Sequence, residues 1–296
     1  MDSKPQINTE MPRKNYSMLE IHIAVLLFGL SGLFGKFLTL PPLVIVFGRT
    51  FVAALTLGAI LFYTKTPLRT RSKRDQIILI LLGAILGAHW VAFFHAIQVS
   101  TVAVGLLTFS TFPLFVTFME PYFFNERLRG FDILTAGFVL VGLALVVPSF
   151  DFQNNVTQGA FWGTISGFTF AVLSVLNRKY VSTYPSIVIV FYQNSVAAIL
   201  LFPFLFFGNF FLQPSDYVLL AVLGVFCTAL AHALFIKGLL HVKAQLASII
   251  ASLEPVYGII FAFLLLDEIP ASRTILGGIV ILGTITLSTI KRHADE

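Results

Sequence analysis

Cysteine and charged residues are both scarce in this sequence, and each shortage excludes a class of protein. The 296 residues include one cysteine, Cys227, which excludes an internal disulfide framework and a cysteine-based metal site. Only 11% of the residues are Asp, Glu, Lys or Arg, against about a quarter in soluble domains, and 57% are apolar. This composition predicts an integral membrane protein.

Motifs of nucleotide hydrolysis and metal catalysis are also missing. The pattern G-x-x-x-x-G-K-[ST] does not occur, because the single Gly-Lys pair, Gly35-Lys36, is followed by Phe37. There is no H-E-x-x-H and no carboxylate cluster with metal-ligand spacing. We therefore expect no cofactor, no metal and no ATPase activity. The basic run from Lys65 to Arg74 indicates membrane orientation, not a nucleic-acid site.

Ten apolar runs are each close to the roughly 20 residues that a membrane-spanning helix needs. The polar residues 1–17 precede them and are expected to form a disordered cytoplasmic tail. The predicted all-α fold therefore has ten transmembrane helices, over residues 18–40, 42–63, 76–99, 102–124, 131–147, 159–180, 186–207, 217–240, 244–266 and 274–290.

The distribution of basic residues predicts the orientation of these helices. With the N-terminus inside, nearly all Lys and Arg residues fall on cytoplasmic segments and helix ends. Arg273 alone falls in an external segment, while Lys36 and Arg49 lie within helices. Because cytoplasmic loops carry the excess of Lys and Arg, we expect both termini to be cytoplasmic.

The two halves of the chain repeat each other. Pro41 and the Val-Ile-Val-Phe run at 44–47 recur 144 residues later as Pro185 and the run at 188–191. A unit of five helices has an odd number of spans, so its second copy starts on the opposite face. We therefore expect inverted repeats over 18–147 and 159–290. Further matches, at offsets of 142 and 141, are Pro113 with Pro255, Glu126 with Glu268, and Gly137 and Gly142 with Gly278 and Gly283.

Three short motifs resemble the drug/metabolite transporter superfamily, in particular its EamA type. They are Phe28-Gly29-Leu30-Ser31 with Lys36, where Phe28 replaces the usual Trp; Pro42 with Arg49; and Leu253-Glu254-Pro255-Val256 with Leu266-Asp267-Glu268. The resemblance covers the chain after residue 17. It implies ten helices in two repeats, and transport of a small solute, usually export, across a bacterial inner membrane.

Two ionisable residues lie deep in the predicted spans and are candidates for substrate binding. Glu254 is ten residues into its run, roughly 15 Å from the membrane surface, and Pro255 beside it should break the helix. Arg49 cannot lose its charge, so we expect one of three partners to face it: Glu254, a substrate carboxylate, or carbonyl oxygens at broken helix ends. Each has a structural alternative: Glu254 as a protonated acid bonded to a neighbouring helix, and Arg49 as a lock that pairs with Glu254. Their repeat equivalents are Phe112 and Gln193.

Histidines and aromatic residues complete the candidate site. Trp90 lies deeper than the interfacial belts where Trp is common, and its repeat equivalent is His232, so we expect both beside one cavity. Either His89 or His232 could instead only bond a neighbouring helix. The residues expected to bind the substrate are Arg49, His89, Trp90, Phe112, Gln193, Asn194, His232, Glu254 and Tyr257.

These candidates predict a secondary transporter of a small zwitterion such as an amino acid, because a carboxylate suits an ammonium group and an arginine suits a carboxylate. Export of lipophilic cationic drugs is the main alternative, and protons are the candidate coupling ion. An intramembrane serine protease around Gly29-Leu30-Ser31-Gly32, with a histidine as base, and a channel are weaker alternatives. We expect a multi-pass inner-membrane protein, a monomer or weak dimer, with no nucleic-acid partner.

Other charged residues are expected to serve structure. Lys36 and Arg178, near helix ends, should extend to the membrane interface. Glu126 and Glu268 precede helices, so their negative charges should interact favourably with the positive N-terminal ends of those helices. Gly159, Gly163 and Gly167, spaced by four, should let helices approach closely.

Overall fold

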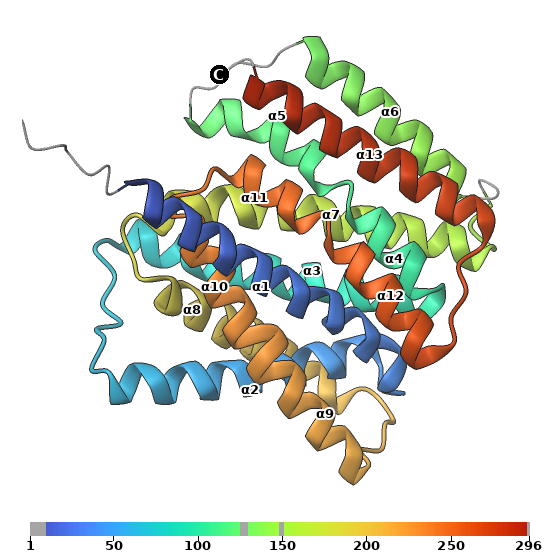
Figure 1. Ribbon diagram of the computed structural model, residues 1–296. Coiled ribbons are helices and arrows are strands. Elements are labelled where there is room, and N and C mark those ends of the chain that lie inside the picture. The colour runs from blue at the N-terminus through green and yellow to red at the C-terminus, as the bar shows by residue number, and fades with distance from the viewer. Residues whose placement is uncertain (1–9, 125–129, 148–150, 295–296) are drawn as a thin grey trace, which may run out of the picture.

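A computed structural model describes residues 10–124, 130–147 and 151–294, and every regular element in these ranges is a helix (Figure 1). The elements are α1 (Glu10–Phe37), α2 (Pro42–Tyr63), α3 (Lys73–Val99), α4 (Val102–Phe109), α5 (Phe112–Phe124), α6 (Gly130–Val146), α7 (Asn155–Tyr180), α8 (Ser186–Leu201), the 3-10 turn η1 (Phe202–Phe206), α9 (Pro214–Gly224), the π-helix η2 (Val225–Leu230), α10 (Ala231–Gly238), α11 (Ala244–Ala251), α12 (Glu254–Leu266) and α13 (Ser272–Ala294).

Eight segments of the described chain are long and apolar enough to cross a membrane, and two shorter apolar helices lie within α6 and α13. The prediction of an all-helical, multi-pass membrane protein is confirmed, whereas ten crossings and the N-in, C-in orientation remain predictions. The first helix differs from the expectation. It begins at Glu10, so residues 10–17 are helical where we expected a tail. Residues 1–9 lie outside the described part of the chain.

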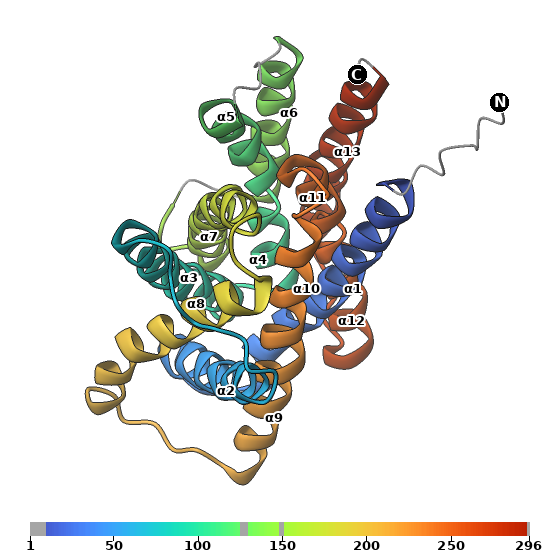
Figure 2. The same cartoon turned by 90° about the vertical axis from the view of Figure 1, so that its left-hand side faces the viewer.

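Helices from the two halves of the chain pack against each other. Close contacts join α3 to α7, α2 to α8, α6 to α13, and α1 to both α10 and α12. In two views, α2, α8 and α9 lie together on one side of the molecule and α5, α6 and α13 on the other (Figures 1 and 2). Residues on α1, α2 and α3 can therefore share one site with residues on α7, α10 and α12.

Glycines allow α7 to approach its neighbours as closely as predicted. A Cβ atom on Gly167 would lie 2.7 Å from the Phe109 carbonyl oxygen, and one on Gly163 would overlap the Thr108 side chain. Real Cβ atoms do not approach so closely, and small residues permit such contacts between membrane helices. The prediction of a packing seam on this helix is confirmed.

Two helical segments are interrupted at equivalent places in the two halves. One break separates α4 from α5 at residues 110–111, and the other separates α11 from α12 at 252–253. Pro113 and Pro255 each occupy the second position of the helix that follows. Proline has no N–H to donate and is favoured in the first turn of a helix, so the position of both prolines fits a restart. The predicted break at Pro255 is confirmed.

Charged residues at the two ends of the molecule bond other helices instead of extending outward. Lys36 Nζ donates to the Ser100 carbonyl oxygen over 2.8 Å, and Arg178 Nη1 lies 2.6 Å from Glu120 Oε1. The expectation that Lys36 and Arg178 reach the membrane interface stays a prediction. Glu268 accepts a bond from the Ala103 amide at the start of α4, not from α13. Glu126 lies outside the described residues.

A tyrosine ties the α7–α8 connection to the start of α3, at the end of the molecule where α1 begins (Figure 1). The Tyr184 hydroxyl donates to Asp75 Oδ2 over 2.7 Å and accepts from the Arg71 amide over 2.8 Å. Burial raises the pKa of Tyr184, so the phenol keeps the proton that it donates to Asp75.

Candidate functional site

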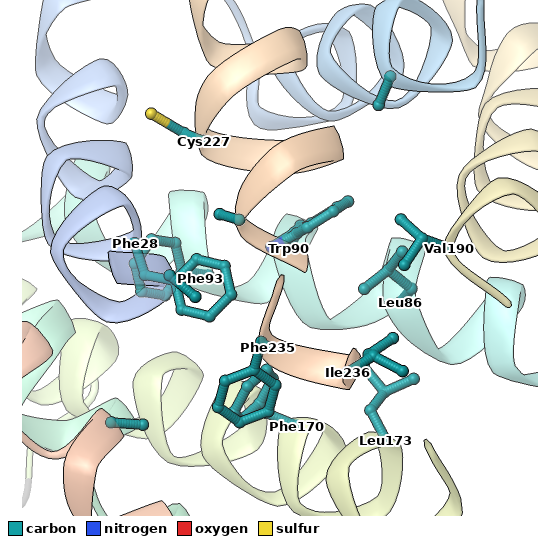
Figure 3. Close-up of a cluster of buried hydrophobic side chains, with 14 of the residues drawn as sticks. Phe28, Leu86, Trp90, Phe93, Phe170, Leu173, Val190, Cys227, Phe235 and Ile236 are labelled. Carbon is teal, nitrogen blue, oxygen red and sulfur yellow. The ribbon is translucent and has the colours of Figure 1, made fainter. Parts of the chain in front are cut away.

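A small cavity lies in the centre of the molecule, where helices of both repeats meet. Its volume is about 20 Å³, which is room for about one water molecule. Several of its aromatic residues converge from α1, α3 and α7 in Figure 3. The lining residues are Phe28, Ser31, Arg49, His89, Trp90, Phe93, Phe109, Phe170, His232 and Glu254.

Arg49 is held in place by one turn of the opposite repeat and by two aromatic rings. Its Nε donates to Thr228 Oγ1 over 2.9 Å, and its Nη2 donates to the Cys227 carbonyl oxygen over 3.2 Å. Its Cζ lies 3.8 Å from the centre of the Trp90 ring and 5.3 Å from that of Phe94. The side chain is 1% exposed, and Nη1 has no hydrogen-bond partner among the described residues. The two N–H groups of Nη1 are thus left for another partner.

The π-helix η2 explains how Arg49 finds these acceptors. Thr228 Oγ1 donates to the Leu223 carbonyl oxygen over 2.7 Å and uses its lone pair to accept from Arg49. Such single-turn π-helices are frequent at functional sites, because the wider turn redirects backbone groups. Gly224, just before η2, lets the segment approach α2: a Cβ atom there would lie 3.0 Å from the Arg49 carbonyl oxygen.

Glu254 is the second charged residue of the cavity and occupies the first position of α12. It is 4% exposed, and its carboxylate makes no hydrogen bond to any described residue. The ion pairs within the described chain do not include one between Glu254 and Arg49. The start of a helix favours a negative charge. The two ionisable side chains of the cavity therefore line it together without forming an ion pair.

Contact between α1 and α12 sets the position of Glu254. A Cβ atom on Gly29 would lie 2.8 Å from Tyr257 Cβ and 3.1 Å from the Glu254 carbonyl oxygen. Any larger residue at position 29 would push the start of α12 away from α1. Tyr257 packs at this contact and does not line the cavity.

The two buried histidines differ in their bonding. His89 Nδ1 lies 3.0 Å from the Ser166 carbonyl oxygen and 2.9 Å from Ser166 Oγ. In the neutral tautomer in which Nδ1 donates to this carbonyl oxygen, Nε2 is an acceptor. The His232 ring lies 4.8 Å from Trp90 and 5.1 Å from Phe28, centre to centre. The expected meeting of Trp90 and His232 beside one cavity is confirmed.

Four phenylalanines complete the cavity wall and were not among the predicted site residues. Phe28 is on α1, Phe93 on α3, Phe109 on α4 and Phe170 on α7. Their rings contact one another and the His89 ring, with centres 5.2 to 6.4 Å apart. The motif at residues 28–31 was the one sequence signal near Phe28, whereas the other three had no distinguishing signal.

Three other predicted residues lie outside the cavity lining. Phe112 packs behind the wall, 5.1 Å from Phe109 and 5.0 Å from Phe170 between ring centres. Gln193 Nε2 donates to Asn177 Oδ1 over 2.6 Å, and Asn194 Nδ2 donates to the Val190 carbonyl oxygen. The buried amide oxygens of both residues lack partners among the described residues. The structure thus brings together Arg49, His89, Trp90, His232 and Glu254, but not these residues or Tyr257.

Ser31, the candidate nucleophile of the protease alternative, lies in the same cavity as both histidines. In the described chain its hydroxyl makes no hydrogen bond to either ring, and His89 Nδ1 is bonded to Ser166 instead. A serine nucleophile needs a base within hydrogen-bond reach. The geometry gives the protease alternative no support.

The chain is similar to transporters along nearly its whole length. It is 24% identical to an uncharacterized transporter, YxxF, of Bacillus subtilis, with 99% of this chain and 95% of the relative covered. It is 24% identical to an S-adenosylmethionine uptake transporter of Rickettsia conorii, over 81% and 80% of the two chains. It is 25% identical to the pseudopaline exporter CntI of Pseudomonas aeruginosa, over 86% and 88%. Transporters of this kind are not enzymes.

A solved structure has the same fold. It matches with a TM-score of 0.70 and 17% identity, over 93% of this chain and 96% of that chain. The family model described as EamA-like transporter family matches twice, at residues 16–147 and 157–290, which agrees with the predicted repeat. These matches confirm the resemblance seen in the motifs: the chain belongs to the EamA-like transporter family of the drug/metabolite superfamily.

Proposed function

We propose that the protein is a secondary transporter that moves a small zwitterion, such as an amino acid, by alternating access. One observation carries this proposal: Arg49 and Glu254 face the same cavity and are not paired with each other. Had they formed an ion pair, the cavity would be effectively neutral and no zwitterion would be favoured. Unpaired, they offer an ammonium group and a carboxylate group a partner each.

The chemistry of the lining supports binding of both ends of such a solute. Arg49 Nη1 is a free donor for a carboxylate oxygen. Glu254 can accept from an ammonium group, as can neutral His89 through Nε2. The rings of Trp90 and Phe28 would pack against the carbon skeleton between the charges. Cation–π contact with Trp90 keeps the guanidinium in place while the site is empty.

The size of the cavity supports alternating access. A cavity of about 20 Å³ cannot hold an amino acid, so helices of the two repeats must separate before a solute binds. Contacts between helices now lie toward both ends of the molecule, Lys36 with Ser100 at one and Glu120 with Arg178 at the other. Rocking of one inverted repeat against the other would open these contacts in turn.

The cellular setting follows from the family. The relatives named above are bacterial, so we place the protein in the inner membrane with both termini in the cytoplasm. Export is the proposed direction, which the family resemblance favours, and protons are the proposed coupling ion. Glu254 is the residue proposed to gain and lose the proton, because it is buried without a fixed partner.

Export of a lipophilic cation is a second candidate, favoured by the aromatic wall. Five Phe and Trp side chains line the same cavity as Glu254, an arrangement that suits organic cations. Such a cation would leave Arg49 unmatched, and its charge would oppose that of the guanidinium.

Counterflow in proteoliposomes tests the proposal. Vesicles containing purified protein are loaded with one unlabelled amino acid at a time, and labelled amino acids are presented outside. We expect saturable exchange of at least one zwitterion, with little exchange of its decarboxylated or deaminated analogue. Exchange of organic cations but of no zwitterion would contradict the proposal and support the second candidate.

A further inference from the structure

A second cavity, much larger than the central one, opens at the end of the molecule where α1 ends. Its volume is about 620 Å³. Its wall includes Lys36 on α1, Thr39 before α2, Gln98 on α3, and Asn209, Phe210 and Phe211 in the connection that precedes α9. We call it the vestibule. Among the described residues that line it, Lys36 is the only charged one.

Lys36 is half-buried and has donors to spare. Its Nζ gives one hydrogen bond to the Ser100 carbonyl oxygen. An ammonium group carries three N–H donors, so two remain for the vestibule. Glu268 lies near enough to attract Lys36, but the two form no ion pair in the described chain, and the Glu268 carboxylate bonds the Ala103 amide. The vestibule therefore presents a positive charge.

Phe94 packs between a residue of the vestibule wall, Gly35, and a residue of the central cavity, Arg49. Ser31 lines the central cavity and Gly35 lines the vestibule, one helical turn or about 6 Å apart along α1. A Cβ atom on Gly35 would lie 3.1 Å from Phe94 Cδ1, so the ring packs directly on this glycine. The same ring lies 5.3 Å from Arg49 Cζ and is fully buried. Phe94 thus packs against Gly35 of the vestibule wall on one side and lies near the guanidinium of Arg49 on the other.

We propose that the vestibule is a second, outer binding site for the carboxylate group of the solute, held by Lys36, and that Phe94 is the barrier between this site and Arg49. The passage of the solute from one site to the other rests on the proposed function, whereas the attraction of anions to the vestibule does not. Once the Phe94 ring moves, a carboxylate that leaves Lys36 can bind the guanidinium of Arg49.

Charged thiol reagents test the anion preference without any transport. Cys227 is buried and is replaced by alanine, and Asn209→Cys then places one reactive thiol in the vestibule wall. We expect an anionic methanethiosulfonate to react faster than a cationic one. Lys36→Gln should lower the ratio of the anionic to the cationic reaction rate on the order of threefold or more. Lys36→Arg should preserve this ratio. An equal ratio in the parent and in Lys36→Gln would overturn the vestibule site.

Three substitutions separate the charge of Lys36 from its bond to Ser100. Arginine keeps the charge and a donor, glutamine keeps a donor alone, and methionine keeps neither. In counterflow with solute on the vestibule side, we expect glutamine and methionine to raise KM on the order of tenfold, with little change in kcat. Normal KM in Lys36→Gln with a defect in Lys36→Met would mean a structural role only. Lys73→Gln, an exposed lysine at the opposite end, is the matched control.

Phe94→Ala tests the barrier. The smaller side chain opens a path between the two cavities, so we expect a bound zwitterion to leave the central site faster. We also expect the zwitterion to protect the Asn209→Cys thiol less well from the methanethiosulfonate reagents. Unchanged dissociation in Phe94→Ala would contradict its role. If Lys36 affects thiol reactivity but the protein exchanges no zwitterion, the vestibule stands and the proposed function fails. If a zwitterion is exchanged and no Lys36 variant alters its KM, the proposed function stands and passage of the solute through the vestibule fails.

Discussion

Arg49 keeps its positive charge at any relevant pH, and the groups that bond or pack against its guanidinium in the proposed site are neutral. Thr228, the Cys227 carbonyl and the Trp90 ring surround it, and one nitrogen is left without a partner. A buried charge is costly unless it is bonded. A solute carboxylate would supply the missing bond, so binding should stabilise the protein as well as fill the cavity.

Arg49→Lys should weaken zwitterion binding while the protein still folds. Lysine keeps the charge but cannot bond Thr228, Cys227 and a solute in the planar geometry of a guanidinium. We expect a loss of about 1.5–3 kcal/mol of binding free energy, the usual range for hydrogen bonds to charged groups. Equilibrium binding of a labelled substrate to detergent-solubilised protein measures it. Wild-type affinity in Arg49→Lys and in Arg49→Gln would exclude Arg49 as a substrate contact.

Glu254→Gln should keep the fold, because glutamine has nearly the same size and a polar head. If Glu254 is the coupling residue, exchange in this variant should no longer respond to a proton gradient, while binding persists. If it is only an ammonium contact, binding should fall at every pH. Counterflow with and without an imposed pH difference separates the two roles. A variant with wild-type affinity, rate and pH response would remove Glu254 from the mechanism.

The charged members of the cavity could be predicted from the sequence, but most of its aromatic wall could not. Arg49 and Glu254 stand out because charge is rare in a membrane span, and His232 stands out as the repeat equivalent of Trp90. Phe109 is 2% exposed and Phe62 is 88% exposed, yet nothing in the sequence distinguishes them. Gln193 shows another limit, because its amide nitrogen bonds Asn177, and only coordinates reveal such a partner.

At the scale of helices, two irregularities in regular α-helix, the break before α12 and the π-helix η2, position groups of the proposed site. The break before α12 puts Glu254 at a helix start inside the molecule, and the π-helix η2 turns the Cys227 carbonyl toward Arg49. Pro255 made the first interruption predictable. The π-helix has no proline or glycine within it, so its sequence is that of an ordinary apolar helix, and the distortion arises from packing.

Gly29→Ala should disturb transport through the position of α12. The added Cβ would lie 2.8 Å from Tyr257 Cβ, so α12 must shift and carry Glu254 with it. We expect a destabilisation of about 1–3 kcal/mol, as for other overpacked contacts, together with a lower exchange rate. Thermal unfolding in detergent measures the first effect and counterflow the second.

Gly137→Ala is the matched control for this substitution. It adds the same methyl group to a glycine of α6 with no atom within 4 Å of the new Cβ. It should leave the exchange rate unchanged and should not lower the unfolding temperature, because alanine without a clash favours the helix. Equal behaviour of Gly29→Ala and Gly137→Ala would mean that the contact between α1 and α12 does not position Glu254.

At the scale of the whole molecule, the repeat brings opposite ends of the chain together. Arg49 belongs to the first match of the family model and Glu254 to the second, so neither repeat could form the site alone. The basic-residue pattern predicts which end faces the cytoplasm.

Thiol labelling tests this topology. In a Cys227→Ala background, Leu68→Cys at one end should react only with reagents that reach the cytoplasm, and Gln153→Cys at the other only with external reagents; both side chains are exposed. Labelling of both thiols from one side would contradict the inverted repeat.

The most direct test of the central claim is a thermodynamic cycle between Glu254 and the ammonium group of the solute. Binding of a zwitterion and of its deaminated analogue is measured by titration calorimetry in the wild type and in Glu254→Gln. We predict that removing the ammonium group weakens binding strongly in the wild type but little in Glu254→Gln, because its partner is already gone. Equal losses in both proteins would show that Glu254 does not contact the ammonium group and would contradict zwitterion recognition at this site.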